Sequence, residues 1–258
     1  MAVKKKIDIS NVPSVNILGV EIHDVTLKET VEILINMIKS GQPHHVMTVN
    51  PEFVMMAQKN SAFLGVLQKA DLKVADGIGI VLGARILGAS LRERVAGVDI
   101  VRRFAATARD NGFRIFLLGA APGVAERTAT LLQKENSGLQ IAGTYAGSPR
   151  PEDEEMICSM IEIAKPHILL VAYGPPQQDL WIARTQQRLR IPIAMGVGGT
   201  FDFIAGVAVR APLWIRRIGL EWLFRLIHEP WRWKRMMSLP LFVLSIIGKR
   251  MNQILCLS

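Results

Sequence analysis

Polar side chains follow two apolar runs of the sequence at spacings that suit chemistry. Asp76 comes directly after "LKVA" and precedes Gly77 and Gly79, which let the backbone approach a ligand closely. Thr48 and Asn50 end the run "HHVMTVN" and lie on one side of an extended chain. A carboxylate in such a place suits a general base, and Thr and Asn suit hydrogen bonds to a sugar. The alternatives are that Asp76 caps the next helix and that the other two only satisfy loop backbone.

Further residues could bind phosphate or sugar groups. Arg94 in "RERVAG" has the forked donors that clamp a diphosphate, and Gln178 after "GPP" suits sugar hydroxyls, although both residue types are more often solvent-exposed. Gly119 and Gly123 in "LLGAAPG" place backbone amides before an expected helix, where a phosphate can bind. Asp202 in "GGTFDF" fits either a ribose hydroxyl or a turn cap.

Metal and nicotinamide chemistry are both disfavoured. The sequence has no D-x-D pair, no paired metal carboxylates and no His or Cys spacing typical of zinc, so we expect neither a metal nor another cofactor. The stretch "DGIGIVLG" imitates a dinucleotide-binding motif, but the acidic residue at the right distance, Asp99, falls in "AGVDIVRRF", which predicts the start of a helix. An NAD-binding enzyme is therefore kept only as an alternative.

These residues need a scaffold, and the order of elements predicts one. From residue 15 to 209, short β-branched runs alternate with helical patterns, which indicates βαβ units and an α/β fold: a single Rossmann-like domain with a mostly parallel sheet. A helix is expected over residues 51–70 and another from Pro151. The expected strands are 15–22, 44–50, 72–76, 113–120, 139–145, 167–174 and 191–197. Ligands of parallel sheets bind beyond the carboxyl ends of the strands, where the residues above lie.

A helical appendage is expected over residues 210–258, after a core of residues 1–209. Nine Lys and Arg against two Glu give this segment a net charge of +7, out of +9 for the 258 residues, and it contains four of the five Trp. Leu220, Leu223, Phe224 and Ile227 follow the spacing of an amphipathic helix, and Pro230 suits the first turn of a second one. Three arginines of the two helices would share a face if the helices stack in line. They are Arg225, Arg232 and Arg235.

The appendage is expected to bind an anionic membrane surface. Its apolar stripe argues against a nucleic-acid partner, and a plain core helix leaves its concentrated positive charge unexplained. The run "MMSLPLFVLSIIG" is shorter than the roughly 20 residues that span a bilayer, so it would lie on the membrane. The start "MAVKKKIDIS" lacks the apolar segment of a signal peptide, and Cys158 and Cys256 indicate no disulfide framework, so we expect a cytoplasmic, peripheral membrane protein. Its apolar surface also makes a homo-oligomer an expectation.

The motifs together resemble the WecG/TagA/CpsF glycosyltransferase family over residues 15–237. They occur in the family's order and spacing: "TVNPE", "ADGIG", "RVAGVD", "YGPPQQD", "GVGGTFDFIAG" and "RAPLWIRRIGLEWLFRLIHEPWRWKR". The last motif is the most specific. One departure is Asp179, where the family usually has Glu, and we expect its effect to be mild because charge and position are kept.

The resemblance implies an inverting, metal-independent transferase. It would move a sugar, commonly N-acetylmannosamine or its uronic acid, from a UDP-sugar donor to N-acetylglucosamine linked to a polyprenyl diphosphate, in synthesis of bacterial surface polysaccharides such as teichoic acid or exopolysaccharide. Transfer of another hexose, such as glucose or galactose, is the alternative. The resemblance assigns the base to Asp76 and an active-site role to the appendage. The implied substrate-binding residues are Thr48, Asn50, Arg94, Gln178, Arg225, Arg232 and Arg235.

Overall fold

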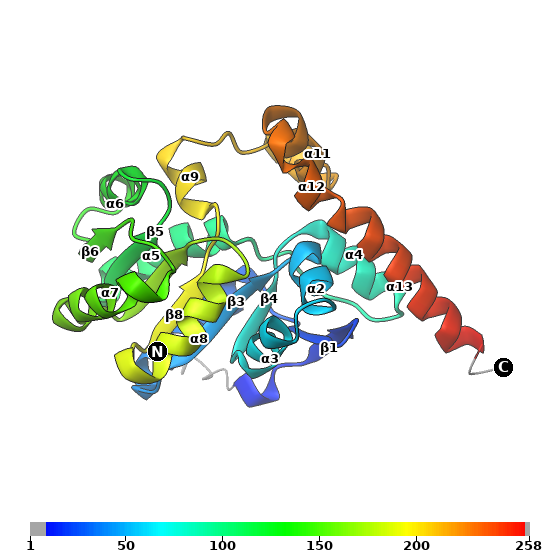
Figure 1. Ribbon diagram of the computed structural model, residues 1–258, viewed down its shortest axis with the longest axis horizontal. Helices are drawn as coiled ribbons and strands as arrows, with labels where there is room; N and C mark the ends of the chain where they lie inside the picture. The colour runs from blue at the N-terminus through cyan, green and yellow to red at the C-terminus, as the bar shows by residue number, and fades with distance from the viewer. Residues whose placement is uncertain (1–8, 256–258) are drawn as a thin grey trace, which may run out of the picture.

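A six-stranded parallel sheet forms the centre of the protein (Figure 1). The computed structural model describes residues 9–255, apart from the side chains of Ser10 and Arg232. The strand order is β4-β3-β8-β7-β5-β6, and all neighbouring strands run parallel. The strands are β3 (His44–Val49), β4 (Leu72–Ala75), β5 (Arg114–Gly119), β6 (Gln140–Tyr145), β7 (Ile168–Ala172) and β8 (Ile193–Gly196). The predicted α/β class with a parallel, Rossmann-like sheet is confirmed.

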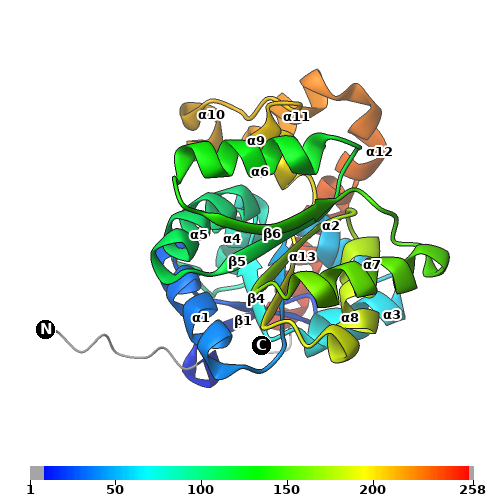
Figure 2. The same ribbon diagram turned by 90° about the vertical axis from the view of Figure 1, so that its left-hand side faces the viewer.

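Helices cover both faces of this sheet, as Figure 2 shows. One face packs against α1 (Leu27–Ser40), α5 (Gly97–Asn111), α6 (Val124–Glu135) and α9 (Thr200–Ala205). On the other face lie α7 (Pro151–Ala164) and α8 (Gln177–Leu189), and towards β3 and β4 also α2 (Pro51–Ala57), α3 (Ser61–Lys69) and α4 (Ile78–Ile86). Because the two central strands β7 and β8 are covered on both sides, their residues are all buried and apolar, as in most parallel strands.

Two sequence-based boundaries are wrong, each because of a local backbone feature. Residues 15–22 do not form one strand of the main sheet. They form an antiparallel hairpin of β1 (Ser14–Ile17) and β2 (Val20–His23), which turns at Leu18 and Gly19, both with positive φ. The helix expected over 51–70 is two helices, because the Asn60 side chain accepts a hydrogen bond from the amide of Phe63 and caps α3 as a new helix.

The appendage is helical, as predicted, and its last helix packs on the core. It contains α10 (Leu213–Arg217), α11 (Glu221–His228), the 3-10 turn η2 (Pro230–Arg232), α12 (Trp233–Met236) and α13 (Ser238–Leu255). In Figure 1, α11 and α12 lie above the ends of the strands, and α13 runs alongside α4. No helix within residues 9–255 is both long and apolar enough to cross a membrane.

Helix α13 is anchored through two side chains. Phe242 and Ile246 are buried in the apolar cluster that also contains residues of α2, α3 and α4. A β-carbon at Gly83 of α4 would lie 2.9 Å from the Phe242 ring, so the glycine permits this close approach. One side of α13 thus faces the core, and the expectation that this run lies on a membrane stays a prediction for its other side. The boundary at residues 209 and 210 stays a prediction.

We expect Phe242→Ala to lower the free energy of unfolding by about 3–5 kcal/mol, because it empties a buried aromatic site in the core. Leu244→Ala, on the same helix but with 66% of its surface exposed, is the matched control and should change this free energy by less than about 0.5 kcal/mol. Urea denaturation followed by circular dichroism measures both. Equal, small effects of the two variants would contradict the packing of α13 on the core.

Candidate active site

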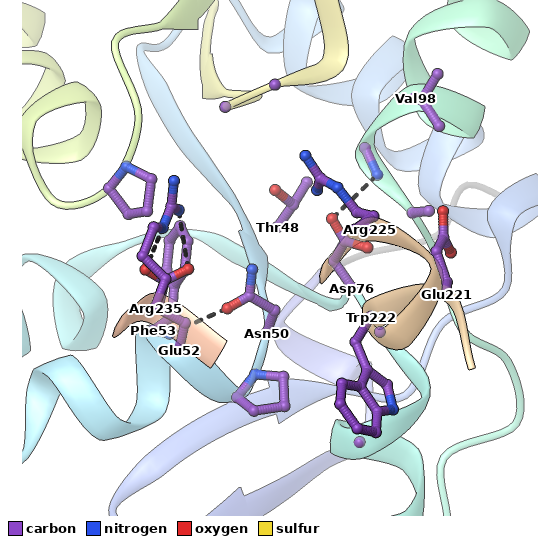
Figure 3. A pocket seen from close by; sticks show the side chains of 18 of the residues that line it. Thr48, Asn50, Glu52, Phe53, Asp76, Val98, Glu221, Trp222, Arg225 and Arg235 are labelled. Carbon is purple, nitrogen blue, oxygen red and sulfur yellow. Dashed lines mark hydrogen bonds and ion pairs between the residues drawn. The ribbon is translucent and has the colours of Figure 1, made fainter. Parts of the chain in front are cut away.

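A pocket of about 240 Å³ lies at the carboxyl ends of β3, β4, β7 and β8, beneath the appendage. Thr48 from β3, Asp76 after β4 and Gln178 at the start of α8 all line it. Helix α11 and the segment after it supply the opposite wall, including Arg225 and Arg235. Figure 3 shows Thr48 and Asp76 from the sheet side of the pocket and Arg225 and Arg235 from the appendage. The fold therefore brings together most of the residues that the sequence singled out.

Asp76 is held at the floor of the pocket by the strand that precedes it. Its amide donates to the carbonyl of Val49 at 2.8 Å, which continues the pairing of β3 with β4. One carboxylate oxygen accepts the amide of Gly97 at 3.4 Å. Helix α4 is capped by Gly77 and has no side-chain cap, so the alternative that Asp76 serves as this cap is wrong.

The surroundings of Asp76 favour its protonated form. Burial raises the pKa of the Asp76 carboxyl from 3.8 to about 6, and the nearby Glu221 carboxylate adds to the rise. The Gly97 amide and the guanidinium groups of Arg94 and Arg210 act in the opposite direction. A carboxylate with a pKa near 6 is still ionised at neutral pH and binds a proton more strongly than an ordinary one, which suits a general base.

Thr48 and Asn50 lie on the same wall, as their spacing predicts. The hydroxyl of Thr48 donates to the carbonyl of Gly196 at 3.3 Å. The side-chain oxygen of Asn50 accepts the amide of Phe53 at 3.1 Å and so caps α2. This bond fixes the orientation of the Asn50 amide group in the pocket wall (Figure 3). The loop-satisfying alternative is therefore confirmed for Asn50, and its role in binding a sugar stays a prediction.

Gln178 is buried and joins two loops of the site. Its side-chain oxygen accepts the amides of Gly174 at 3.2 Å and Gly198 at 2.9 Å, which follow β7 and β8. The next residue, Asp179, is fully buried and lies 3.3 Å from the ring of His45. Its carboxylate thus contacts a side chain of β3 beneath the pocket and does not line the pocket itself.

Arginines of the core and the appendage line the pocket. On the core side, Arg94 donates to Glu221 of α11 at 2.7 Å. Arg235 of α12 makes a two-bond ion pair with Glu52 of α2, at 2.7 and 2.9 Å. Both ion pairs therefore connect the appendage to the core. Figure 3 shows the Arg235–Glu52 pair on one side of the pocket and Glu221 on the other. The side chain of Arg232, which was also predicted to bind substrate, lies outside the described part of the structure.

Two further arginines complete this wall. Arg225 stacks over the ring of Phe203 at 4.7 Å and lies 3.5 Å from Glu229. Arg210 bonds the Asp99 carboxylate twice, both at 2.7 Å. Sequence reasoning did not assign Arg210 to the site, although the "RAPLW" stretch that marks the start of the appendage begins with it. Glu221 and Glu52 were missed as well, because no local pattern distinguishes a carboxylate that pairs across the fold.

The residues predicted to bind a nucleotide do not line this pocket. A β-carbon at Gly119 would lie 2.8 Å from the backbone of Ala172, so this glycine allows β5 and β7 to pack. Gly123 caps the start of α6, and Asp202 lies in the first turn of α9. Their role in binding a nucleotide stays a prediction.

The geometry of the acidic and cysteine residues bears on the metal and dinucleotide alternatives. Within residues 9–255, no group of three or more His, Cys, Asp or Glu is arranged to hold a metal ion. Asp99 lies in the first turn of α5 and pairs with Arg210, whereas a dinucleotide site needs an acidic residue at the end of a strand. Cys158 is buried with a free thiol, and Cys256 lies outside the described residues.

A parallel α/β sheet with a buried carboxylate and several arginines at its strand ends is the arrangement of a group-transfer enzyme that acts on an anionic substrate. The chain belongs to the glycosyl transferase WecG/TagA/CpsF family, whose model matches residues 15–255. It is thus a glycosyltransferase.

Relatives from two genera are similar over nearly the whole chain. A Bacillus subtilis (strain 168) protein is 33% identical over 245 residues, which cover 95% of this chain and 92% of the relative. A Staphylococcus aureus (strain MRSA252) protein is 31% identical over 239 residues, covering 92% and 93%. Both relatives are named N-acetylglucosaminyldiphosphoundecaprenol N-acetyl-beta-D-mannosaminyltransferase.

Proposed function

We propose that this glycosyltransferase moves N-acetylmannosamine from a UDP donor to N-acetylglucosamine that is linked through a diphosphate to a polyprenol. The observation that carries the proposal is the placement of Asp76, with a pKa raised to about 6, in one pocket with four arginines. The pocket thus offers a base for a hydroxyl group and cations for phosphates. The names of the relatives above support the choice of sugar and acceptor.

In the proposed reaction, the Asp76 carboxylate takes the proton from the acceptor hydroxyl as its oxygen attacks the anomeric carbon of the donor sugar. The new carbon–oxygen bond forms while the bond to UDP breaks, and UDP leaves with that electron pair. One displacement inverts the anomeric configuration. Thr48, Asn50 and Gln178 line the same pocket and would orient the sugar hydroxyls.

The arginines would stabilise the negative charge that develops on the leaving UDP. Preorganised cations in a sheltered pocket act strongly on such charge, since little reorganisation is needed during the reaction. Arg94, Arg225 and Arg235 come from different elements around the pocket, so together they can surround a diphosphate. We propose that these groups do this without a metal ion. Activity that persists after treatment with EDTA is the corresponding test.

The exposed side of the appendage is proposed to bind the cytoplasmic face of the cell membrane, because the acceptor is itself a membrane lipid. Its exposed apolar side chains extend over α10 to α13, with the basic Arg217 and Lys234 also exposed. This mixture suits the headgroup region of an anionic bilayer. We define the appendage apolar surface as Trp214, Ile227, Trp231, Trp233, Leu244 and Met251.

The identity of the donor sugar and self-association of the chain are tested separately. Another UDP-hexose, such as UDP-glucose or UDP-galactose, would use the same base and the same arginines, so a panel of donors with a short-chain lipid acceptor decides between them.

A second copy of the chain would also cover the appendage apolar surface. Analytical ultracentrifugation with and without vesicles separates self-association from membrane binding.

Asp76→Asn should reduce turnover by about 10²–10⁴-fold, because an amide cannot accept the proton. In the wild type, turnover should fall as pH is lowered through about 6, since protonation of Asp76 removes the base. Radiolabelled sugar transfer measures both, and UDP binding measured by calorimetry should be retained in the variant. Asp110→Asn, at an exposed carboxylate on α5, is the control. Full turnover of Asp76→Asn would remove Asp76 as the base.

Trp231→Ser combined with Trp233→Ser should weaken binding to phosphatidylglycerol vesicles by at least about tenfold, because two large apolar groups leave the proposed membrane contact. Ile163→Ser, at a highly exposed apolar residue of α7, is the matched control and should not change binding. Vesicle sedimentation measures the bound fraction. Undiminished binding of the double variant would contradict docking through this surface.

A further inference from the structure

Glu221, the first residue of α11, joins the appendage to the core next to the base. Its Oε2 accepts a hydrogen bond from Nη1 of Arg94 at 2.7 Å, and its Oε1 lies 3.8 Å from Nε of Arg210. All three side chains are at least three-quarters shielded from solvent, where an ion pair is stronger than on an open surface. The same carboxylate is therefore within reach of two arginines of the pocket.

Arg94 and Arg210 differ in the hydrogen-bond partners of their guanidinium groups. Arg94 already bonds Glu221, whereas Arg210 uses Nη1 and Nη2 for Asp99. The Nε of Arg210 is buried and, among the described residues, has no hydrogen-bond partner. A buried N–H group without a partner is costly, and the nearest carboxylate oxygen recorded for it belongs to Glu221. A small movement of Glu221 would satisfy this group.

We propose that Glu221 is a positioning residue whose ion pair with Arg94 holds α11 against the core beside Asp76. When substrate phosphates bind Arg94, the Glu221 carboxylate moves and pairs with Arg210 instead. The inference rests on the proposed function for the identity of the phosphates. The role of Glu221 in holding α11 against the core does not depend on that function. Helix α11 also carries Trp222 and Arg225 into the pocket, so the position of Glu221 fixes these side chains too. Throughout the exchange, Arg210, the first residue of the appendage, stays bonded to Asp99 of α5 and so links the appendage to the core.

The electrostatics around Asp76 agree with this role. The charged groups that act on its carboxyl are Arg94, from the segment before α5, Arg210, from the segment before α10, and Glu221 of α11. Both arginines lower the pKa of Asp76 and Glu221 raises it. With Glu221 in place, Asp76 is thus a stronger base than it would be beside Arg94 without a carboxylate partner.

Glu221→Gln tests the proposal, because it keeps the shape of the side chain and removes its charge. Without any substrate, trypsin should cleave the appendage roughly tenfold faster, because α11 separates from the core more often when its ion pair with Arg94 is lost. In sugar transfer, the acid limb of kcat/KM should move to lower pH, because loss of the Glu221 charge lowers the pKa of Asp76. The full-length chain is used throughout.

Glu229→Gln is the matched control. It removes the same charge from the same appendage, but Glu229 pairs with Arg225 within the appendage, whereas Glu221 is among the groups that shift the pKa of Asp76 most. It should leave the acid limb in place and change the cleavage rate by less than about twofold. Glu221→Asp, which keeps the charge, should restore the pH profile at least in part, and circular dichroism verifies that each variant is folded.

The outcomes separate this inference from the proposed function. If Glu221→Gln behaves like Glu229→Gln in both measurements, Glu221 does not seat α11 and the inference is overturned. If cleavage accelerates as expected but the wild type transfers no sugar from any UDP donor, the seating stands and the proposed function fails.

Discussion

Arginines and the Asp76 carboxylate share one pocket, and the structure depends on keeping these opposite charges from neutralising each other. Each pocket arginine has its own carboxylate: Glu221 for Arg94, Asp99 for Arg210, Glu229 for Arg225 and Glu52 for Arg235. Asp76 makes no ion pair among the described side chains and bonds only a backbone amide. Burial therefore raises the pKa of Asp76. A direct ion pair with an arginine would have lowered this pKa.

The arrangement of core and appendage follows from the same constraint. Three of the four pairs connect the appendage to the core, so the charges that would bind phosphate also hold the wall of the pocket in place. These pairs alone would be a weak attachment, because ion pairs with solvent contact contribute little. The apolar packing of α13 through Phe242 and Ile246 supplies the lasting anchor. Helices α10 to α12 then lie between a fixed core and a fixed last helix, which confines them to the region above the pocket.

Much of the fold and the principal residue of the site could be predicted from the sequence. Alternating apolar runs and helical patterns locate the six parallel strands, and the general rule for such sheets places Asp76, Thr48 and Asn50 together. The hairpin at Leu18 and Gly19 was missed, because Leu seldom adopts a positive φ and the run reads as one strand. Pattern reasoning also cannot distinguish a glycine needed for packing from one that approaches a ligand, as Gly119 illustrates.

Ion-pair partners were beyond the reach of sequence reasoning for a different reason. Arg94 and Glu221 are 127 positions apart, and Arg235 and Glu52 are 183 apart, so their pairing exists only once the sheet and the appendage are assembled. Local spacing predicted an arginine face on the appendage, and Arg225 and Arg235 do reach the pocket. It gave no indication of which carboxylates would hold them, and these carboxylates decide how the charge of the pocket is distributed.

The central claim is that Asp76 promotes a single displacement at the anomeric carbon. The most direct measurement is the anomeric configuration of the transferred sugar, determined by nuclear magnetic resonance on the product of wild-type enzyme, an α-linked UDP-N-acetylmannosamine donor and a short-chain lipid acceptor. The account predicts a β-linked product. An α-linked product would show retention of configuration and would contradict a mechanism in which Asp76 acts only as a base.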